Sequence, residues 1–254
     1  GGASAVPALL ETSVQGEETL AQAALSALAG LPGKEVDEVI VSRLTKAEGA
    51  MKMVLVDLAG RRRIGAAVPA LKAAAGDADE KVRLAAIRSL GSTVGPDDLP
   101  VLITRLDGAG TAAEKAAAMK ALKAASQRMA DKDACAAKIL EPLAAAPKAS
   151  KRVYFEALAA VGGDTALHSL CTEARDSDAD IRAAAVAILG AWSSEDAAPE
   201  LLGLVKAAAG DPERLAALKA FGSVVRRLRF PKEQRLGLCQ EGMQVARNVD
   251  EKKV

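Results

Sequence analysis

Aromatic residues are scarce in this chain, whose 254 residues include one Trp, one Tyr and three Phe. Carbohydrate-binding grooves and base-stacking surfaces are built on aromatic side chains, so we expect this sequence to form neither. Half of the composition is hydrophobic, mainly Ala, Leu and Val. Ala is the strongest helix former, whereas β-sandwiches and barrels need more β-branched and aromatic residues. The composition therefore predicts an all-α protein.

Residues and motifs that commonly carry catalysis or bind metals are also few. The single histidine, His168, has no Ser, Cys or Asp nearby in a triad pattern, so we interpret it as a surface or half-buried helix residue. No HExxH, Walker loop or strand-following GxGxxG is present. Cys135, Cys171 and Cys239 lack metal-ligand spacing and are interpreted as small buried residues, with one disulfide as the alternative. We predict no enzyme, no cofactor, and no catalytic, cofactor-binding or metal-binding residue.

The charges balance, with 34 basic and 33 acidic residues. Nonspecific nucleic-acid binding depends on an excess of Lys and Arg, and that excess is missing here. Basic clusters do occur, and we interpret them as solvated loops or helix ends unless stacking joins two of them into a site for an anionic partner. They are Arg61–Arg63, the group Lys148, Lys151 and Arg152, and the group Arg226, Arg227 and Arg229. No run of 18 apolar residues exists, which predicts no membrane span.

A repeat of about 31 residues runs along the chain. Pro69 and Pro100 lie 31 residues apart before similar apolar pairs, and Pro7 lies twice that distance before Pro69. The repeat predicts two amphipathic helices of about 12 residues per unit, because apolar positions recur at i, i+3, i+4 and i+7. One face of the second helix is marked by Val82, Ala85, Ala86 and Leu90, and the same face later by Ile181, Ala184, Ala185 and Leu189.

The joints between the expected helices have their own signals. Asp residues in segments 76–79 and 176–178 predict N-caps for the second helices, and the pairs Glu17-Glu18 and Asp97-Asp98 predict acidic helix starts. Recurring glycines predict left-handed helix ends; they are Gly30, Gly60, Gly91, Gly163, Gly190 and Gly222. The fourth unit lacks such a glycine and is longer, so we place an insertion at about Ser126 to Asp133.

The segment Val82-Arg83-x-x-Ala86-x-x-x-Leu90-Gly91 recurs as Ile181-Arg182-x-x-Ala185-x-x-x-Leu189-Gly190. This motif resembles the bacterial HEAT-repeat family. The resemblance implies a right-handed α-α superhelix, a HEAT-like solenoid of about seven to eight helix pairs that forms a single domain over residues 1–254. It also implies that Arg83 and Arg182 support an Asp ladder between repeats. Units two, four and five lack this Arg, so we expect the ladder to be interrupted there.

The stretch from Arg214 to Val254 is similar to HEAT segments of large bacterial envelope proteins that carry a jelly-roll domain of the sugar-hydrolase type. This narrower resemblance implies a fragment that is truncated at its C-terminus. It also favours the cell envelope or periplasm over the cytoplasm.

From the solenoid we predict a noncatalytic scaffold whose concave surface, lined by the second helices, binds another protein or a neighbouring domain of the same chain. We expect a monomer. The predicted interaction residues are Lys81, Leu84, Arg88, Lys115, Lys120, Arg152, Glu156 and Arg182. One alternative is a nucleic-acid-binding protein similar to HEAT-fold DNA glycosylases, for which Trp192 with Asp196 is the faint signal. The other is an enzyme, such as a HEAT-like lyase that handles bilins, which requires a deep polar pocket.

Overall fold

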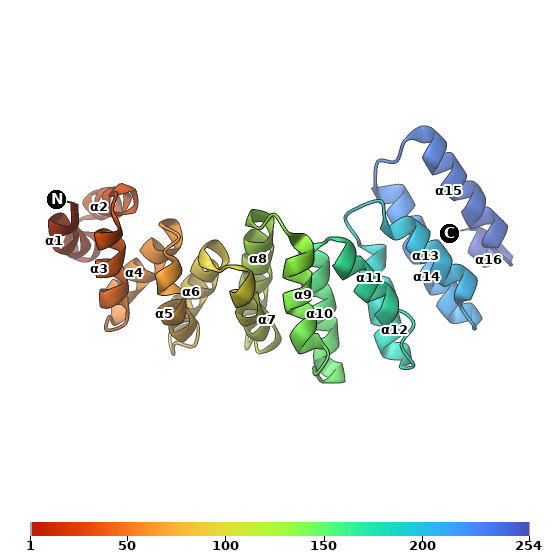
Figure 1. Ribbon diagram of the computed structural model, residues 1–254, viewed down its shortest axis with the longest axis horizontal. Coiled ribbons are helices and arrows are strands. Elements are labelled where there is room, and N and C mark those ends of the chain that lie inside the picture. The colour runs from red at the N-terminus through yellow and green to blue at the C-terminus, as the bar shows by residue number, and fades with distance from the viewer. Residues whose placement is uncertain (1, 254) are drawn as a thin grey trace. The chain divides into compact units, whose positions relative to one another are not determined.

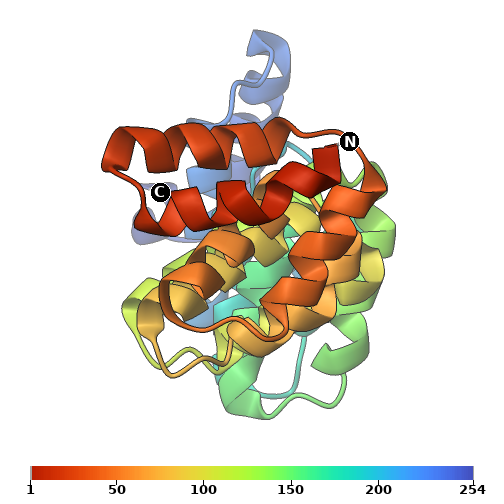
Figure 2. The same cartoon turned by 90° about the vertical axis from the view of Figure 1, so that its left-hand side faces the viewer.

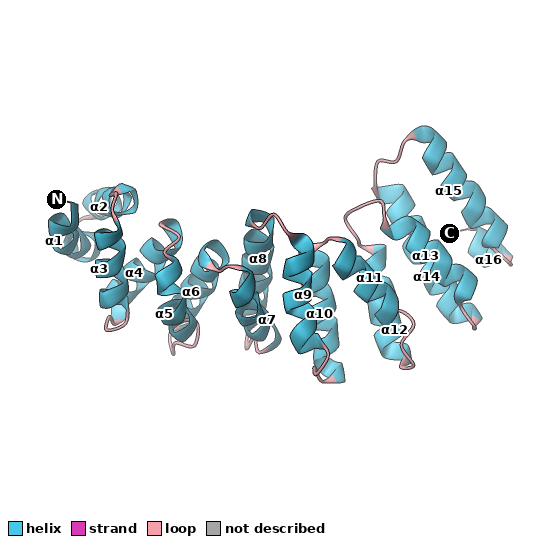
Figure 3. Cartoon of the chain, in the orientation of Figure 1, coloured by secondary structure: helices cyan, strands magenta, loops and turns pink. Residues whose placement is uncertain are grey.

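The computed structural model describes residues 2–253, and these residues form helices and connecting loops (Figure 3). No strand occurs among them, which confirms the all-α prediction. Two short 3₁₀ turns, Gly65–Ala67 and Pro96–Asp98, precede first helices of helix pairs. No helix in the described range is long and apolar enough to cross a membrane.

The chain divides into two compact units, residues 1–130 and 131–254. The division falls between Ala130 and Asp131, inside the segment where the sequence predicted an insertion. A single solenoid over residues 1–254 stays a prediction, and the two units are described separately below.

Unit 1 is a stack of helix pairs that follow each other in chain order (Figure 1). The first pair, α1 and α2, lies side by side at the front of Figure 2, in red. The second helices α2, α4, α6 and α8 contact each other in succession, as expected for HEAT-like repeats. The helices of this unit are α1 (Gly2–Gln15), α2 (Glu18–Gly30), α3 (Lys34–Leu44), α4 (Gly49–Arg61), α5 (Val68–Ala74), α6 (Glu80–Thr93), α7 (Leu99–Asp107) and α8 (Ala112–Arg128).

Unit 2 repeats this arrangement, with α10, α12 and α14 stacked in succession. Its last helix, α16, has four residues, so the expected seven pairs with a partial eighth are observed. The helices of this unit are α9 (Lys132–Leu143), α10 (Lys148–Val161), α11 (Asp164–Glu173), α12 (Ala179–Gly190), α13 (Ala197–Ala207), α14 (Asp211–Arg227), α15 (Lys232–Val245) and α16 (Val249–Lys252).

The apolar spacing and the N-cap residues predicted from the sequence are both observed in α6 and α12. The expected apolar face of α6 is buried, with Val82 and Leu90 at 3% and 0% exposure. Asp79 caps α6, because its side chain accepts a hydrogen bond from the Lys81 amide at 2.8 Å. Asp178 caps α12 in the same way, accepting from the Asp180 amide at 2.9 Å. Apolar burial and a capped start therefore both contribute to α6 and α12.

The glycine prediction was largely wrong. Only Gly163 of the six has a positive φ, 92°, and it lies at the start of α11 rather than at a helix end. Gly91 instead lies inside α6, where an added Cβ would come within 2.6 Å of the Ala121 Cα in α8. In the same way, a Cβ added to Gly190 of α12 would lie 2.9 Å from the Ala220 Cβ of α14. These glycines are required by the close approach of neighbouring helices, not by a left-handed turn.

Candidate interaction surface

A basic residue occupies the fourth position of each second helix from α4 to α14. In unit 1, Lys52 of α4 forms an ion pair with Asp77, which precedes α6. Arg83 of α6 donates through Nε to the Glu114 Oε1 of α8 at 2.6 Å. The Arg83 Nη1 also donates to the backbone carbonyls of Asp77 and Ala78. We call this forward-reaching series the N-terminal ladder.

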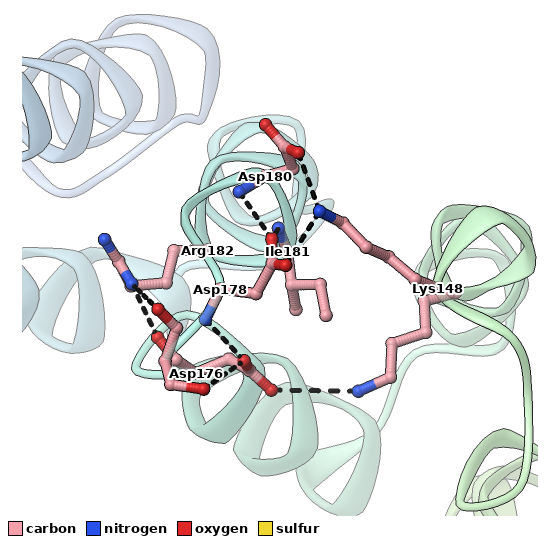
Figure 4. Close-up of polar contacts among 8 residues, drawn as sticks. Lys148, Asp176, Asp178, Asp180, Ile181 and Arg182 are labelled. Atoms are coloured by element: carbon pink, nitrogen blue, oxygen red, sulfur yellow. Dashed lines mark hydrogen bonds and ion pairs between the residues drawn. The ribbon is translucent and has the colours of Figure 1, made fainter.

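Unit 2 builds the same ladder with the same residue types. Lys151 of α10 contacts Glu173 at 3.0 Å and Asp176 at 3.8 Å. Arg182 of α12 pairs with Glu213 of α14, and its Nη1 donates to the Asp176 and Ser177 carbonyls, as Figure 4 shows for Asp176.

Beside this contact, Lys148 reaches Asp178 and Asp180 at 2.7 and 2.8 Å (Figure 4). Its hydrogen bond lowers the pKa of the Asp178 carboxyl. The expectation of a ladder interrupted in units two and five was wrong, because Lys52 and Lys151 replace the arginine there.

The last step of the ladder is fully buried. Arg214 of α14 and Glu251 of α16 are 3% and 1% exposed in their side chains and lie 3.1 Å apart. The backbone amide of Arg247 also donates to Glu251, at 2.6 Å. This amide and the Arg214 guanidinium lower the pKa of the Glu251 carboxyl. A buried pair of this kind fixes the position of α16, because either charge alone would be left unpaired away from water.

Arginines also close the opposite ends of the second helices. Arg62, directly after α4, donates to the Leu28 and Leu31 carbonyls at the end of α2, at 2.7 and 2.6 Å. Arg128 of α8 donates to the Gly91 carbonyl at the end of α6, at 3.0 Å. Arg227 of α14 does the same for Gly190 of α12, at 3.4 Å. Carbonyls at a helix C-terminus lack helical partners and favour a cation.

These contacts give a structural role to one arginine in each of two basic clusters of the sequence. Arg62 and Arg227 belong to clusters that we had interpreted as solvated helix ends, yet both bind the preceding repeat. Sequence reasoning missed this role, although the recurrence of an arginine at the ends of α4, α8 and α14 was a usable signal.

The two units share a register of 99 residues. Lys52 and Lys151 lie 99 positions apart, as do two ladder arginines, their glutamate partners and two of the helix-end arginines. These pairs are Arg83 with Arg182, Glu114 with Glu213, and Arg128 with Arg227. Most residues of the ladder therefore match between the units, whereas Arg62 corresponds to Val161 and the buried Ser89 to Ile188.

The outward surface of the second helices is formed by their fifth and ninth residues, and we call it the second-helix face. In unit 1 it comprises Met53 and Asp57 of α4, Leu84 and Arg88 of α6, and Ala116 and Lys120 of α8. In unit 2 it comprises Arg152 and Glu156 of α10, Ala183 and Ala187 of α12, and Leu215 and Lys219 of α14.

The predicted interaction residues divide between this face and the ladder. Leu84, Arg88, Lys120, Arg152 and Glu156 lie on the second-helix face, and all are exposed or partly exposed. Lys81 is an exposed residue of the first turn of α6, one turn before Leu84 and Arg88. Lys115 and Arg182 instead occupy the ladder position of α8 and α12.

Within unit 2, Arg152 and Glu156 pair with each other at 3.3 Å. Arg182 is committed to Glu213 and to two backbone carbonyls. The three predicted interaction residues of unit 2 are therefore engaged within the unit, Arg152 and Glu156 with each other and Arg182 with the next repeat.

A polar hollow of about 200 Å³ opens on the second-helix face between α4 and α6. Its lining residues are Asp57, Gly60, Arg61, Ala85, Arg88, Ser89 and Ser92. A larger hollow of about 670 Å³ lies between α12 and α14 and is lined mainly by alanines. Protein pockets for small molecules commonly measure about 300–1,000 Å³, so the polar hollow suits a single side chain better than a whole ligand.

The aromatic side chains are all withdrawn from the surface. Trp192, Tyr154, Phe155, Phe221 and Phe230 are between 0% and 9% exposed. Trp192, the signal for a DNA-glycosylase-like protein, is 2% exposed and donates to Ser194. No aromatic platform for a base or a sugar is therefore available on the described surface.

The remaining chemically reactive residues are scattered. His168 is exposed on α11, as interpreted from the sequence. Cys135 and Cys171 are buried as predicted, whereas Cys239 is exposed, and all three are free thiols. Burial raises the pKa of Cys171 to about 12. Among residues 2–253, no group of three or more His, Cys, Asp or Glu side chains is placed to hold a metal ion.

Comparison with protein families finds HEAT repeats in part of this chain. The family described as HEAT repeats matches residues 38–123, which run from α3 into α8. No curated protein sequence matches the chain. The repeat motif and the helix pairing thus agree with the resemblance inferred from Val82 to Gly91.

Two solved structures resemble the chain over most of its length. Human deoxyhypusine hydroxylase in complex with glycerol is 19% identical, with 99% of this chain and 93% of that chain covered and a TM-score of 0.39. The complex of CpcE and CpcF of phycocyanin lyase from Nostoc sp. PCC7120 is 18% identical, with 94% of both chains covered and a TM-score of 0.41. At such identities the likeness is one of fold.

These two matches correct one expectation. A hydroxylase and a lyase are enzymes, so the prediction that this chain is not an enzyme is contradicted. That prediction relied on the absence of motifs such as HExxH. Sequence motifs of that kind belong to particular families, and their absence does not separate catalytic from noncatalytic helical repeats.

Proposed function

We propose that the chain is a protein-binding scaffold and that the second-helix face carries the binding surface. HEAT repeats over residues 38–123 support this proposal, since such repeats commonly present extended surfaces to proteins. The N-terminal ladder and the helix-end arginines support it as well, because they fix successive second helices in register. A surface of residues in fixed register is preorganised for a partner of matching shape and charge.

The observation that carries the proposal is the contrast between the two units at Leu84 and Arg88. Their counterparts 99 residues later are Ala183 and Ala187, so the stack does not require a large or charged side chain at either position. Leu84 is nonetheless a partly exposed apolar side chain, and Arg88 an exposed cation, on the same face of α6. Arg88 also lines the polar hollow, and exposed side chains that unit 2 replaces by alanine are suited to contacts with a partner.

Site-specific photo-crosslinking in the native cell tests this function. A photoreactive amino acid at Leu84 should give a protein adduct of defined mass. The matched control carries the same group at Thr104, an exposed residue of the first helix α7, and should give none. Adduct formation at both sites alike, or at neither, would argue against a scaffold that uses the second-helix face.

A further inference from the structure

Cations without internal partners gather on the second-helix face of unit 1. Within the described part of the chain, the side chains of Lys81, Arg88 and Lys120 form neither an ion pair nor a hydrogen bond. The carboxylates on the same helices are engaged. Asp57 pairs with Arg61 at 2.6 Å, and the largely buried Glu114 pairs with Arg83.

Glu80, at the start of α6, accepts a hydrogen bond from the Thr111 hydroxyl at 3.1 Å. This bond from a neutral hydroxyl leaves the charge of Glu80 in place, so the three unpaired cations face one uncompensated carboxylate and the local potential is net positive.

The polar hollow between α4 and α6 contains one of these cations. The Ser89 hydroxyl is committed to the Val56 carbonyl at 2.8 Å, and Arg61 is committed to Asp57. Arg88 and the partly exposed Ser92 remain as donors that line the hollow. A guanidinium beside a hydroxyl is a donor pair for a carboxylate, which Arg can bind through two parallel hydrogen bonds.

An apolar row lies one helical turn before the cations. Met53, Leu84 and Ala116 occupy the fifth position of α4, α6 and α8, and the three helices stack in that order. Arg88 and Lys120 occupy the ninth position of α6 and α8, so the cations run parallel to the apolar row. Methionine adapts readily to the shape of a bound side chain. The face thus offers an apolar row beside a basic row.

We propose that this face binds an acidic, amphipathic segment of a protein partner, with a carboxylate in the hollow at Arg88 and aliphatic side chains along Met53 and Leu84. This inference rests on the scaffold function and specifies its partner. The complementary partner presents carboxylates and aliphatic groups on one side, as an amphipathic helix or strand does.

A nucleic acid fits this face less well. Its phosphates would use the cations but leave the apolar row against a charged backbone, and its bases would find no exposed aromatic side chain. The arginines Arg62 and Arg128, which a basic groove would need, are bound to the carbonyls of preceding helices. Apolar and basic rows together therefore favour an acidic protein segment.

The test measures fluorescence anisotropy of a labelled synthetic peptide with Glu and Leu at i, i+4 spacing, added to the full chain. A second peptide with Lys in place of every Glu is the charge control. We expect the Glu peptide to bind with a Kd in the micromolar range and to weaken as salt is raised, and the Lys peptide not to bind. Failure of the Glu peptide to bind at up to roughly 1 mM would overturn the inference.

Variants locate the binding. Arg88→Ala and Leu84→Ala introduce the residues that unit 2 carries at the matching positions, so the stack should tolerate both. We expect Arg88→Ala to raise the Kd roughly tenfold, which corresponds to about 1.4 kcal/mol. Lys34→Ala, which removes an exposed cation of the first helix α3, should change the Kd less than twofold, or about 0.4 kcal/mol. Equal losses from Arg88→Ala and Lys34→Ala would show general charge attraction and overturn the proposed site.

Two further outcomes separate this inference from the scaffold function. A DNA oligonucleotide that displaces the peptide, binds more tightly and is weakened by Arg88→Ala would identify a nucleic-acid surface and overturn the inference. If crosslinking at Leu84 captures a protein through a segment that is neutral or basic, the scaffold function stands and the acidic partner is wrong. If the peptide binds but Leu84 gives no adduct in the cell, the scaffold function fails instead.

Discussion

Arg83 in α6 and Glu114 in α8 join two successive repeats, with 2.6 Å between the Nε and Oε1 atoms. The same guanidinium donates to the Asp77 and Ala78 carbonyls, at 2.9 and 2.8 Å. One side chain therefore fixes the loop before its own helix and the start of the next second helix. The relative position of α6 and α8 therefore depends in part on this residue, together with the Gly91–Ala121 crossing and the Arg128 contact.

Replacement of Arg83 tests that dependence. Arg83→Met keeps an aliphatic stem but removes the donors, and we expect the free energy of unfolding of unit 1 to fall by about 2 kcal/mol. Lys81→Met, two residues earlier, removes an exposed cation that the stack does not use and should cost less than about 0.5 kcal/mol. Urea denaturation followed by circular dichroism measures both, and equal losses would contradict the ladder.

The ladder also predicts loss of stability in acid. The Arg83 hydrogen bond lowers the pKa of Glu114, and the Lys52 hydrogen bond lowers that of Asp77, from ordinary values of 4.5 and 3.8. A carboxyl whose pKa is lower in the folded state stabilises the fold above its ordinary pKa. That contribution declines as the pH falls below about 4.5 and is lost once the pH passes the folded pKa.

Thermal unfolding between pH 7 and pH 2 measures this decline. Glu114→Gln should unfold at a lower temperature than the wild type at pH 7, and the difference should shrink as the pH falls toward 2. Glu48→Gln replaces an exposed carboxyl that forms no side-chain hydrogen bond or ion pair in the described structure and serves as the control. A difference at Glu114 that is the same at every pH would contradict the assigned role.

Replacement of a glycine by alanine should change the stability of the protein in opposite directions at Gly91 and Gly30. Gly91→Ala places a Cβ within 2.6 Å of the Ala121 backbone, and overpacking of this kind typically costs about 1–3 kcal/mol. Gly30→Ala lies at the end of α2 with no atom near the added Cβ, so the helix propensity of Ala should stabilise by about 0.5 kcal/mol. Thermal unfolding of the two variants should therefore shift in opposite directions from the wild type.

The three free cysteines should differ in reactivity. Cys239 is exposed on α15, whereas Cys135 and Cys171 are buried, with thiol pKa values raised by burial. A disulfide-exchange reagent at pH 8 should therefore titrate one thiol in the native protein and three in denaturant. Cys239→Ser should abolish the native reaction, and rapid reaction of two or three thiols would contradict the burial of the other two.

The raised pKa of Cys171 also predicts that the free energy of unfolding decreases at alkaline pH. Its folded pKa of about 12 exceeds the ordinary value of 9.0, so the folded state keeps the proton longer than the unfolded chain does. The stabilisation is complete below pH 9 and is lost progressively as the pH rises toward 12. Cys171→Ala should therefore reduce the dependence of urea stability on pH in this range. An unchanged dependence would show that other groups, such as lysines, dominate.

Much of this architecture could be predicted from local pattern. The spacing of Pro69 and Pro100 gave the length of the repeat, and Asp79 and Asp178 were correctly identified as caps, because capping acts within a few residues. The role of Gly91 was mistaken, since a glycine required at a crossing and one required by a turn look alike in sequence. Only the neighbouring helix distinguishes them.

The ladder was only partly predictable for a related reason. Arg83 and Arg182 were recognised through the repeated motif, but Lys52 and Lys151 were overlooked because they differ in type from the expected arginine. Their equivalence lies in their position as the fourth residue of a helix, and that position is known only when the helix start is known. Arg182, which we predicted as an interaction residue, forms an ion pair with Glu213, and periodicity alone does not show which partner a cation reaches.

The 99-residue register has a consequence for the history of the molecule. Matching residues at such a constant offset are what a tandem duplication of an ancestral three-repeat gene would leave behind. After such an event, each copy retains what assembly demands and is free to diverge elsewhere, as Arg88 and Ala187 have done. A partner that recognises Leu84 and Arg88 would therefore meet only alanine at the matching positions of unit 2.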